Sequence, residues 1–200
     1  MQTIAGLPDV QSVFEVGPGG HFCAKNLRAI GYQYDTFDFD DTHSPTYIGN
    51  LAMFNIAGLE EKYDLTCAFQ VLEHMPWDVF VKNIRKLATL SKKYVFISIP
   101  YSCKGFSVTL ETHDGQFRKL LKQFRRYKPT NMPQRKYRQK YMDEYPWAVH
   151  YWELGRKGIS IDTVRNALNE CTLQIIEQFH SRNAFHYFFL CEKNRVAHYT

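Results

Sequence analysis

A glycine-rich run near the start of the chain most constrains how it can fold. Residues 13–16 (Val-Phe-Glu-Val) form a short apolar stretch typical of a buried strand, and Gly17, Gly19 and Gly20 follow it. Glycine lets the backbone turn sharply and lets a ligand come into contact with it. A helical pattern with Leu27 begins directly after the run, and Gly31 is its expected end. These residues predict a strand, a ligand-binding turn and a helix.

A second strand, over residues 34–40, ends in acidic residues. An acid at this position after a crossover helix can accept hydrogen bonds from the hydroxyls of a ribose. Asp38 and Asp40 are the two candidates for this acid. Either acid could instead cap the turn over residues 41–45.

The spacing of the glycines separates two classes of nucleoside cofactor. A dinucleotide fingerprint would place a third glycine at position 22, where this chain has Phe22. The pattern Glu15-x-Gly17-x-Gly19 instead resembles the first motif of class I S-adenosylmethionine-dependent methyltransferases, of the type 11 and type 23 kind. Residues 63–76 and 94–101 are similar to the fourth and fifth strands of that family, so the resemblance covers about residues 12–101. The family's third glycine position is His21 here, which is a departure.

The resemblance implies a single methyltransferase domain over residues 1–200. Its expected fold is α/β and Rossmann-like: a seven-stranded, mostly parallel sheet with the last strand antiparallel and helices on both faces. Residues 173–179 and 185–191 would form the last two strands. The implied cofactor is S-adenosyl-L-methionine, with S-adenosyl-L-homocysteine as the product. Its implied contacts are Glu15, Gly17, Pro18, Gly19, Gly20, Asp38, Phe39, Asn50, Leu51 and Gln70. Asn50 would bond the adenine edge, or it could simply form a strand-to-loop turn.

A basic segment begins beyond the family pattern. Residues 118–140 contain ten Lys and Arg residues and no acid, so the net charge of +5 comes from this part of the chain. Phe117, Leu120, Leu121 and Phe124 predict a helix at its start. We expect residues 104–158 to form a basic, aromatic lid or insert. The alternative is a surface that binds RNA, an anionic substrate or an acidic partner.

Several aromatic and titratable residues could serve the methyl acceptor. The expected acceptor contacts are Tyr101, Trp152 and Glu153. His150 and His74 are the two candidate bases, although His74 could make only a structural hydrogen bond and His150 could belong to an aromatic brace. No ligand spacing supports a metal site.

Composition excludes other classes. Apolar residues make up 44% and aromatic residues 16% of the 200 residues, which indicates an ordered globule. The sequence contains no apolar run long enough to predict a membrane span, and we expect no signal peptide from its first residues. Five cysteines without a C-x-x-C pair indicate reduced thiols and a cytoplasmic location. The expected function is methyl transfer to a small or medium-sized acceptor, with an anionic acceptor as one option; the alternatives are an RNA methyltransferase and an inactive, methyltransferase-like binding subunit.

Overall fold

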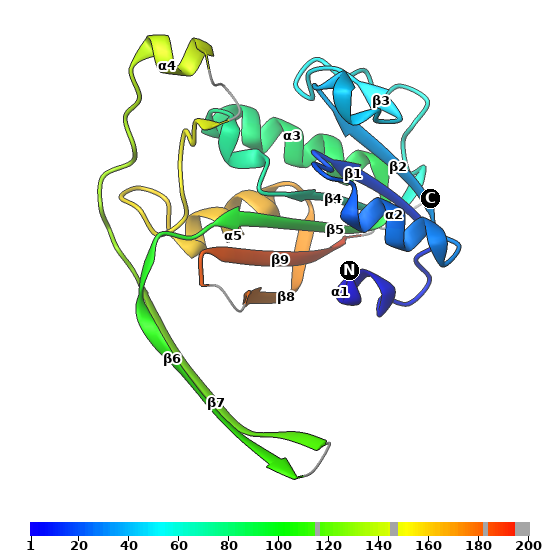
Figure 1. The fold of residues 1–200 in the computed structure, drawn as a ribbon. Helices are drawn as coiled ribbons and strands as arrows, with labels where there is room; N and C mark the ends of the chain where they lie inside the picture. The colour runs from blue at the N-terminus through cyan, green and yellow to red at the C-terminus, as the bar shows by residue number, and fades with distance from the viewer. Residues whose placement is uncertain (115–116, 145–147, 182–183, 195–200) are drawn as a thin grey trace.

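The computed structural model describes residues 1–114, 117–144, 148–181 and 184–194. A seven-stranded sheet forms its centre, with the strand order β3-β2-β1-β4-β5-β9-β8 (Figure 1). The strands are β1 (Ser12–Val16), β2 (Gln33–Asp38), β3 (Tyr47–Ile48), β4 (Tyr63–Phe69), β5 (Ser91–Pro100), β8 (Leu173–His180) and β9 (His186–Lys193). Strands β1 to β5 are parallel, and β9 is antiparallel to both β5 and β8. This architecture confirms the predicted fold class.

Helices cover both faces of the sheet, because side chains of successive strand residues point to opposite faces. Phe14 of β1 packs in one apolar cluster with α3 (Trp77–Leu90) and α5 (Ile161–Glu170). Val13 packs in a second cluster with α1 (Gln2–Ala5) and α2 (Phe22–Ala29). Phe80, Ile84 and Leu87 form an apolar stripe along α3 and are fully buried.

The structure also shows the cap of α5 and the state of the cysteines. Ser160 caps α5 through a capping box with Thr163. All five cysteines are free thiols, and Cys67, Cys171 and Cys191 are buried.

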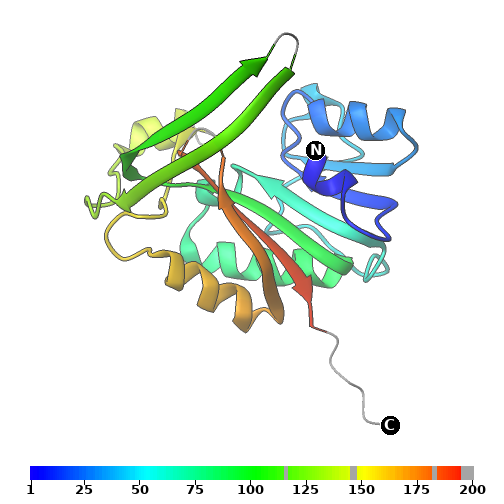
Figure 2. The same ribbon diagram turned by 90° about the horizontal axis from the view of Figure 1, so that it is seen from below.

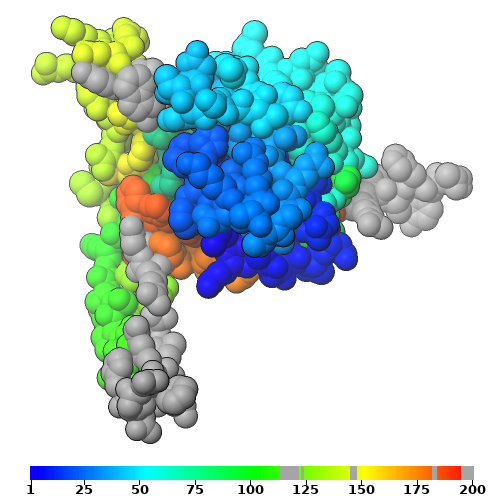
Figure 3. Space-filling model, turned by 45° about the vertical axis from the view of Figure 1, so that its right-hand side comes forward, coloured from blue at the N-terminus to red at the C-terminus, as the bar shows by residue number. Residues whose placement is uncertain are grey.

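The prediction of a helix over residues 117–124 is wrong. The basic segment begins instead with strand β7 (Phe117–Pro129), which pairs antiparallel with β6 (Cys103–Asp114) in a separate two-stranded sheet. This hairpin extends away from the main sheet as an arm (Figures 1 and 2). The space-filling view likewise shows it standing out from the body of the molecule (Figure 3).

The rest of the expected insert follows the hairpin. Residues 130–138 run along residues 153–157, with hydrogen bonds from Asn131 N to Gly155 O and from Lys157 N to Met132 O, both 2.9 Å. Helix α4 (Gln139–Glu144) comes next, and residues 115–116 and 145–147 of the insert lie outside the described part of the chain. Among the helices that the structure describes, none is both long and apolar enough to cross a membrane.

Candidate functional site

The glycine turn lies at the carboxyl end of β1, where the chain passes from one half of the sheet to the other. Gly17 has φ +67°, and a Cβ atom at this position would lie 2.4 Å from Val71 Cγ2. Its amide donates a 2.8 Å hydrogen bond to Phe37 O. A Cβ atom on Gly19 or Gly20 would meet nothing within 4 Å. The turn therefore packs on its inner side against the exits of β2 and β4, and its outer side borders open space that a ligand can enter.

Glu15 lies buried one step before this turn. It is 4% exposed, and the Tyr34 hydroxyl donates a 3.1 Å hydrogen bond to its Oε2 atom. Burial raises the pKa of the Glu15 carboxyl to about 7, against the opposing effect of that hydrogen bond.

The two acids after β2 have different environments. Asp38 is 6% exposed; its Oδ2 lies 3.2 Å from His43 Nδ1, and its Oδ1 accepts a hydrogen bond from Asp40 N. Asp40 accepts hydrogen bonds from the amide and the hydroxyl of Thr42, so it caps the turn η1 (Asp41–His43). Phe39 between them is 63% exposed. Asp38 is therefore the acid that sits at the strand end, and Asp40 takes the capping role.

The tips of β3 and β4 lie next to these residues. Gly49 N donates to Asp38 O, which places Asn50 and buried Leu51 beside the end of β2. The Asn50 side-chain oxygen accepts a 2.9 Å hydrogen bond from Ala52 N, so it forms the turn that was the alternative to an adenine contact. Gln70, with φ +57°, ends β4 and donates from Nε2 to Ser98 Oγ at 3.2 Å.

A second group of side chains forms where residues 148–154 dock on the turn η2 (Leu72–His74). Three hydrogen bonds make this contact: His74 Nδ1 with Val149 O at 2.9 Å, Tyr151 N with Glu73 O at 2.9 Å, and Trp152 Nε1 with Met75 O at 3.1 Å. The docking brings His150 against His74, with ring centroids 5.0 Å apart and planes at 74°. Residues that are far apart in the sequence thus meet beside the exit of β4.

Glu73 is the third member of this group. It is 1% exposed, and Nε2 of His74 lies 3.9 Å from its Oε1 atom. Burial raises the pKa of the Glu73 carboxyl to about 7. Burial lowers the pKa of His74, and the hydrogen bond of its ring to the Val149 carbonyl is the largest effect that opposes burial.

Glu153 anchors the same segment. Its carboxylate accepts hydrogen bonds from Arg156 Nε at 2.6 Å and Arg135 Nε at 2.8 Å, and it lies 3.0 Å from His150 Nδ1. Burial opposes its ionisation, but the hydrogen bonds from His150 and Arg156 and the charges of both arginines outweigh burial, and its pKa falls to about 2. Glu153 is therefore ionised, and its contact with Nδ1 fixes the orientation of the His150 ring.

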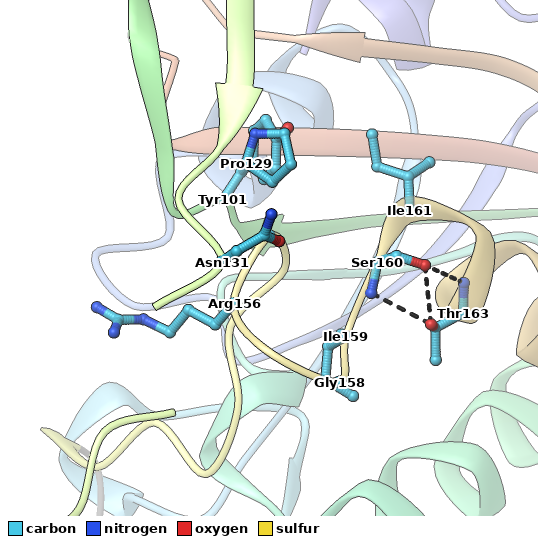
Figure 4. Close-up of a pocket in the computed structure, with 10 residues that line it drawn as sticks. Tyr101, Pro129, Asn131, Arg156, Gly158, Ile159, Ser160, Ile161 and Thr163 are labelled. Atoms are coloured by element: carbon cyan, nitrogen blue, oxygen red, sulfur yellow. Dashed lines mark hydrogen bonds between the residues drawn. The ribbon is translucent and has the colours of Figure 1, made fainter. Parts of the chain in front are cut away.

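Two pockets lie beside this group. One of about 430 Å³ is lined by Tyr101, Pro129, Asn131, Gly155, Arg156, Gly158, Ile159, Ser160, Ile161 and Thr163 (Figure 4). The other, of about 400 Å³, is lined by Tyr101, Ser102, Cys103, Arg135, Glu153, Arg156, Ala184 and Phe185. Of the three expected acceptor contacts, Tyr101 and Glu153 line at least one pocket. Trp152 is 3% exposed, packs edge-to-face on Trp77, and lines neither.

Two residues of these groups were not predicted. Glu73 was part of a recognised motif but had no role assigned, and His43 appeared only as a turn residue. The sequence showed no further metal ligand at a suitable spacing from His150. Tertiary docking supplies Glu73 and His74 from a position more than seventy residues away.

The fold and the glycine turn after β1 define a Rossmann-like α/β protein whose strand order reverses between β1 and β4, the position at which open α/β sheets bind ligands. No protein-family model and no curated protein matches the chain. Solved structures do. An S-adenosylmethionine-dependent methyltransferase from Mesorhizobium loti matches with a TM-score of 0.60 and 12% identity, over 94% of each chain.

Two further solved structures match the chain. The CcbJ methyltransferase from Streptomyces caelestis has a TM-score of 0.60 and 12% identity, over 96% of this chain and 93% of that one. Magnesium protoporphyrin IX methyltransferase from Synechocystis PCC 6803, solved with bound S-adenosylmethionine, has a TM-score of 0.57 and 14% identity, over 96% of this chain and 74% of that one. The fold of this protein is that of the class I S-adenosylmethionine-dependent methyltransferases, as the resemblance over residues 12–101 predicts.

Proposed function

We propose that this protein is an S-adenosylmethionine-dependent methyltransferase. The observation that carries the proposal is the meeting of the Gly17 turn, Asp38 and the exit of β4 at one edge of the sheet. Gly19 and Gly20 would admit the amino-acid end of the cofactor, and Asp38 would accept hydrogen bonds from the ribose hydroxyls. Pro18, Phe39, Asn50, Leu51 and Gln70 would complete the site, with Glu15 buried behind the turn.

The cofactor would supply the reactive group, a methyl carbon on a cationic sulfur. The acceptor atom would attack this carbon in line, the carbon–sulfur bond would break, and the electron pair would stay on sulfur to give S-adenosylhomocysteine. The protein's part is to align the acceptor and exclude water. His150 and His74 are the proposed bases, because both lie beside the exit of β4.

The proposed acceptor is a small or medium-sized anion. The pocket of about 400 Å³ carries two guanidinium groups, Arg135 and Arg156, beside the single carboxylate of Glu153. Arg135 keeps 52% of its side chain exposed, so it can meet a further anion. The insert over residues 104–158 would then form one wall of the acceptor site.

Calorimetric titration tests the cofactor. Wild-type protein should bind S-adenosylmethionine and S-adenosylhomocysteine in the micromolar range and should not bind NADH. Asp38→Ala should weaken both adenosyl ligands about tenfold or more, because it removes charge-assisted hydrogen bonds. Asp40→Ala is the matched control and should stay within about threefold, since Asp40 caps a turn. Binding of NADH instead, or no difference between the two variants, would overturn the proposal. Release of S-adenosylhomocysteine with anionic acceptors then separates an enzyme from an inactive binding subunit.

A second candidate function, methylation of RNA, is favoured by one face of the β6–β7 hairpin. Residues directly opposite each other in the pairing share a face. That face carries Lys104, Phe106, Val108 and Leu110 from β6, and Lys122, Phe124, Arg126 and Lys128 from β7. All eight are exposed, and the rings of Phe106 and Phe124 lie 5.9 Å apart. Cations next to exposed rings suit a single-stranded nucleic acid, because phosphates meet the cations and bases stack on the rings.

A further inference from the structure

We propose that Glu73, His74 and His150 form a binding site for a divalent transition-metal ion. One carboxylate oxygen and two imidazole nitrogens from these residues all lie within 4.8 Å of one another. Two histidines and one carboxylate are the donor set that proteins use for zinc and for iron, cobalt or manganese. The site lies beside the proposed cofactor crevice but shares no residue with it.

The strongest evidence is the state of Glu73. Its side chain is 1% exposed, and neither carboxylate oxygen has a hydrogen-bond partner among the residues that the structure describes. A buried carboxylate without a partner is costly, and native proteins compensate such groups with hydrogen bonds, ion pairs or metal ions. A ring nitrogen of each histidine lies within 4.8 Å of a Glu73 carboxylate oxygen, so a cation held among the three residues would complete its coordination.

The histidines are already oriented as metal ligands. His74 Nδ1 bonds the Val149 carbonyl at 2.9 Å, and His150 Nδ1 bonds the Glu153 carboxylate at 3.0 Å. A hydrogen bond from Nδ1–H to an oxygen fixes the tautomer and makes Nε2 the metal ligand, which is the usual arrangement around metal-bound histidines. Glu153 is itself held by Arg135 and Arg156, so the ring of His150 has a rigid support.

The separation of the donors is close to what a metal needs. Zinc–ligand bonds of about 2.1 Å in a tetrahedral site place donor atoms about 3.4 Å apart. The largest separation here is 4.8 Å, so small side-chain rotations would bring the donors to bonding distance. The backbone does not need to move, because three hydrogen bonds fix residues 149–152 on the turn η2 and Met75.

Three protein ligands leave at least one coordination position open, as in catalytic zinc sites. Val71, two residues before Glu73, touches the Gly17 turn, so the open position would lie near the proposed methyl donor. With the metal bound, His74 and His150 would be ligands and would not act as bases, and a hydroxyl acceptor at the open position would lose its proton to water more readily. Its oxygen would then attack the methyl carbon as the carbon–sulfur bond breaks. This role of the metal rests on the proposed function, whereas metal binding itself does not.

Metal titration tests the site directly. Untagged protein, treated with a chelator and dialysed, should bind one equivalent of Zn²⁺ in calorimetry, and Co²⁺ should give the visible absorption bands of a site with few ligands. His150→Ala and Glu73→Gln should each weaken Zn²⁺ binding at least tenfold, and Glu153→Gln should weaken it about tenfold through the orientation of His150. His43→Ala is the matched control, because His43 also pairs with a carboxylate but lies outside the group.

Three outcomes would overturn the proposal. They are no binding of Zn²⁺ or Co²⁺ by wild-type protein, binding by His150→Ala as tight as that of wild type, and an equal loss of binding in His43→Ala. Circular dichroism confirms that each variant is folded, and Glu73→Gln preserves the shape of the side chain. The titration contains no S-adenosylmethionine. If the metal binds and the cofactor does not, the proposed function fails and the metal site stands; the reverse result removes the metal site alone.

Discussion

Gly17 shows how one residue constrains the candidate site. It combines a left-handed backbone with direct contact between its Cα and the side chain of Val71. A side chain at this position would be strained by the positive φ and would also push against Val71. The glycine therefore fixes the turn to the exit of β4.

We expect Gly17→Ala to lower the free energy of unfolding by about 2–4 kcal/mol, since the left-handed conformation costs about 1 kcal/mol and overpacking adds 1–3 kcal/mol. Urea unfolding of the cofactor-free protein measures the change. Gly20→Ala is the control and should change stability by less than about 0.5 kcal/mol, because its Cβ would enter open space. Equal effects of the two substitutions would contradict the role given to Val71.

The residues of the turn and of the strand ends could be predicted from sequence, because each is marked by a pattern of neighbouring residues. A glycine run after a buried strand, and an acid one strand later, can be recognised without knowledge of distant contacts. Glu73 and His43 could not be assigned in this way. Their partners, His150 and Asp38, are set by the docking of a long insert and by a short turn, and neither leaves a fixed spacing in the sequence.

At the scale of elements, the β6–β7 hairpin is where prediction from sequence failed. Four apolar residues at helical spacing favoured a helix, but a short apolar pattern does not by itself distinguish helix from strand. The stretch Phe106-Ser107-Val108-Thr109-Leu110 alternates apolar and polar residues, and Asp114-Gly115 is a dipeptide typical of hairpins. Together they give the strand at 117–129 a partner, and pairing overrides the helical periodicity.

If this hairpin binds RNA, its exposed cations should account for the salt dependence. Lys122→Gln with Arg126→Gln should lower the slope of log affinity against log salt by about 1.4 for a short unstructured RNA, because each phosphate contact on a single strand contributes about 0.7 to the slope. Arg125 and Arg135 are poorer choices, since they bond Ser181 O and Glu153. Fluorescence anisotropy at several salt concentrations measures the slope.

The control for this experiment is the pair Lys82→Gln and Arg85→Gln on helix α3, which removes the same charge elsewhere on the surface. It should leave the slope within about half a unit of the wild-type value. An unchanged slope for the hairpin variant, or the same decrease for both variants, would remove RNA as the ligand of this face.

At the scale of the whole molecule, the sheet could be predicted almost completely. Its strands are buried apolar runs separated by helices with clear stripes, so local patterns and the global fold agree. In the insert after β5, local sequence patterns do not indicate the path of the chain. Its course is decided by side-chain contacts such as the bonds of Glu153 to two arginines, and by backbone hydrogen bonds of Asn131 with Gly155 and of Met132 with Lys157.

The two ends of β1 place acids in opposite environments. At the amino end, Asp64 accepts hydrogen bonds from Gln11 N, from Ser12 N and from the Ser12 hydroxyl, and it pairs with Lys92. Burial opposes its ionisation, but these donors outweigh burial and lower its pKa to about 2. At the carboxyl end, burial raises the pKa of Glu15 to about 7, and the hydrogen bond from Tyr34 is the largest of the effects that oppose it. The burial of Glu15, at the end of β1 where we propose that the cofactor binds, is therefore less well compensated by hydrogen bonds than the burial of Asp64.

These opposite shifts predict how stability depends on pH. The raised pKa of Glu15 means that the unfolded chain gives up this proton first, so stability falls as pH rises from 4.5 to about 7 and then levels off. The lowered pKa of Asp64 contributes stability that is fully present above pH 3.8 and is lost as pH falls toward about 2.

Urea unfolding without cofactor measures these effects. The free energy of unfolding of Glu15→Gln should equal that of wild type near pH 4.5 and should be higher by up to about 3 kcal/mol near pH 8. Asp64→Asn should be less stable than wild type by about 2 kcal/mol near neutral pH and should approach it near pH 2. Glu170→Gln, an exposed acid at the end of α5, should follow the wild-type curve throughout. If Glu15→Gln also followed that curve, Glu15 would be compensated by contacts other than Tyr34, and the carboxyl end of β1 would carry no cost in stability.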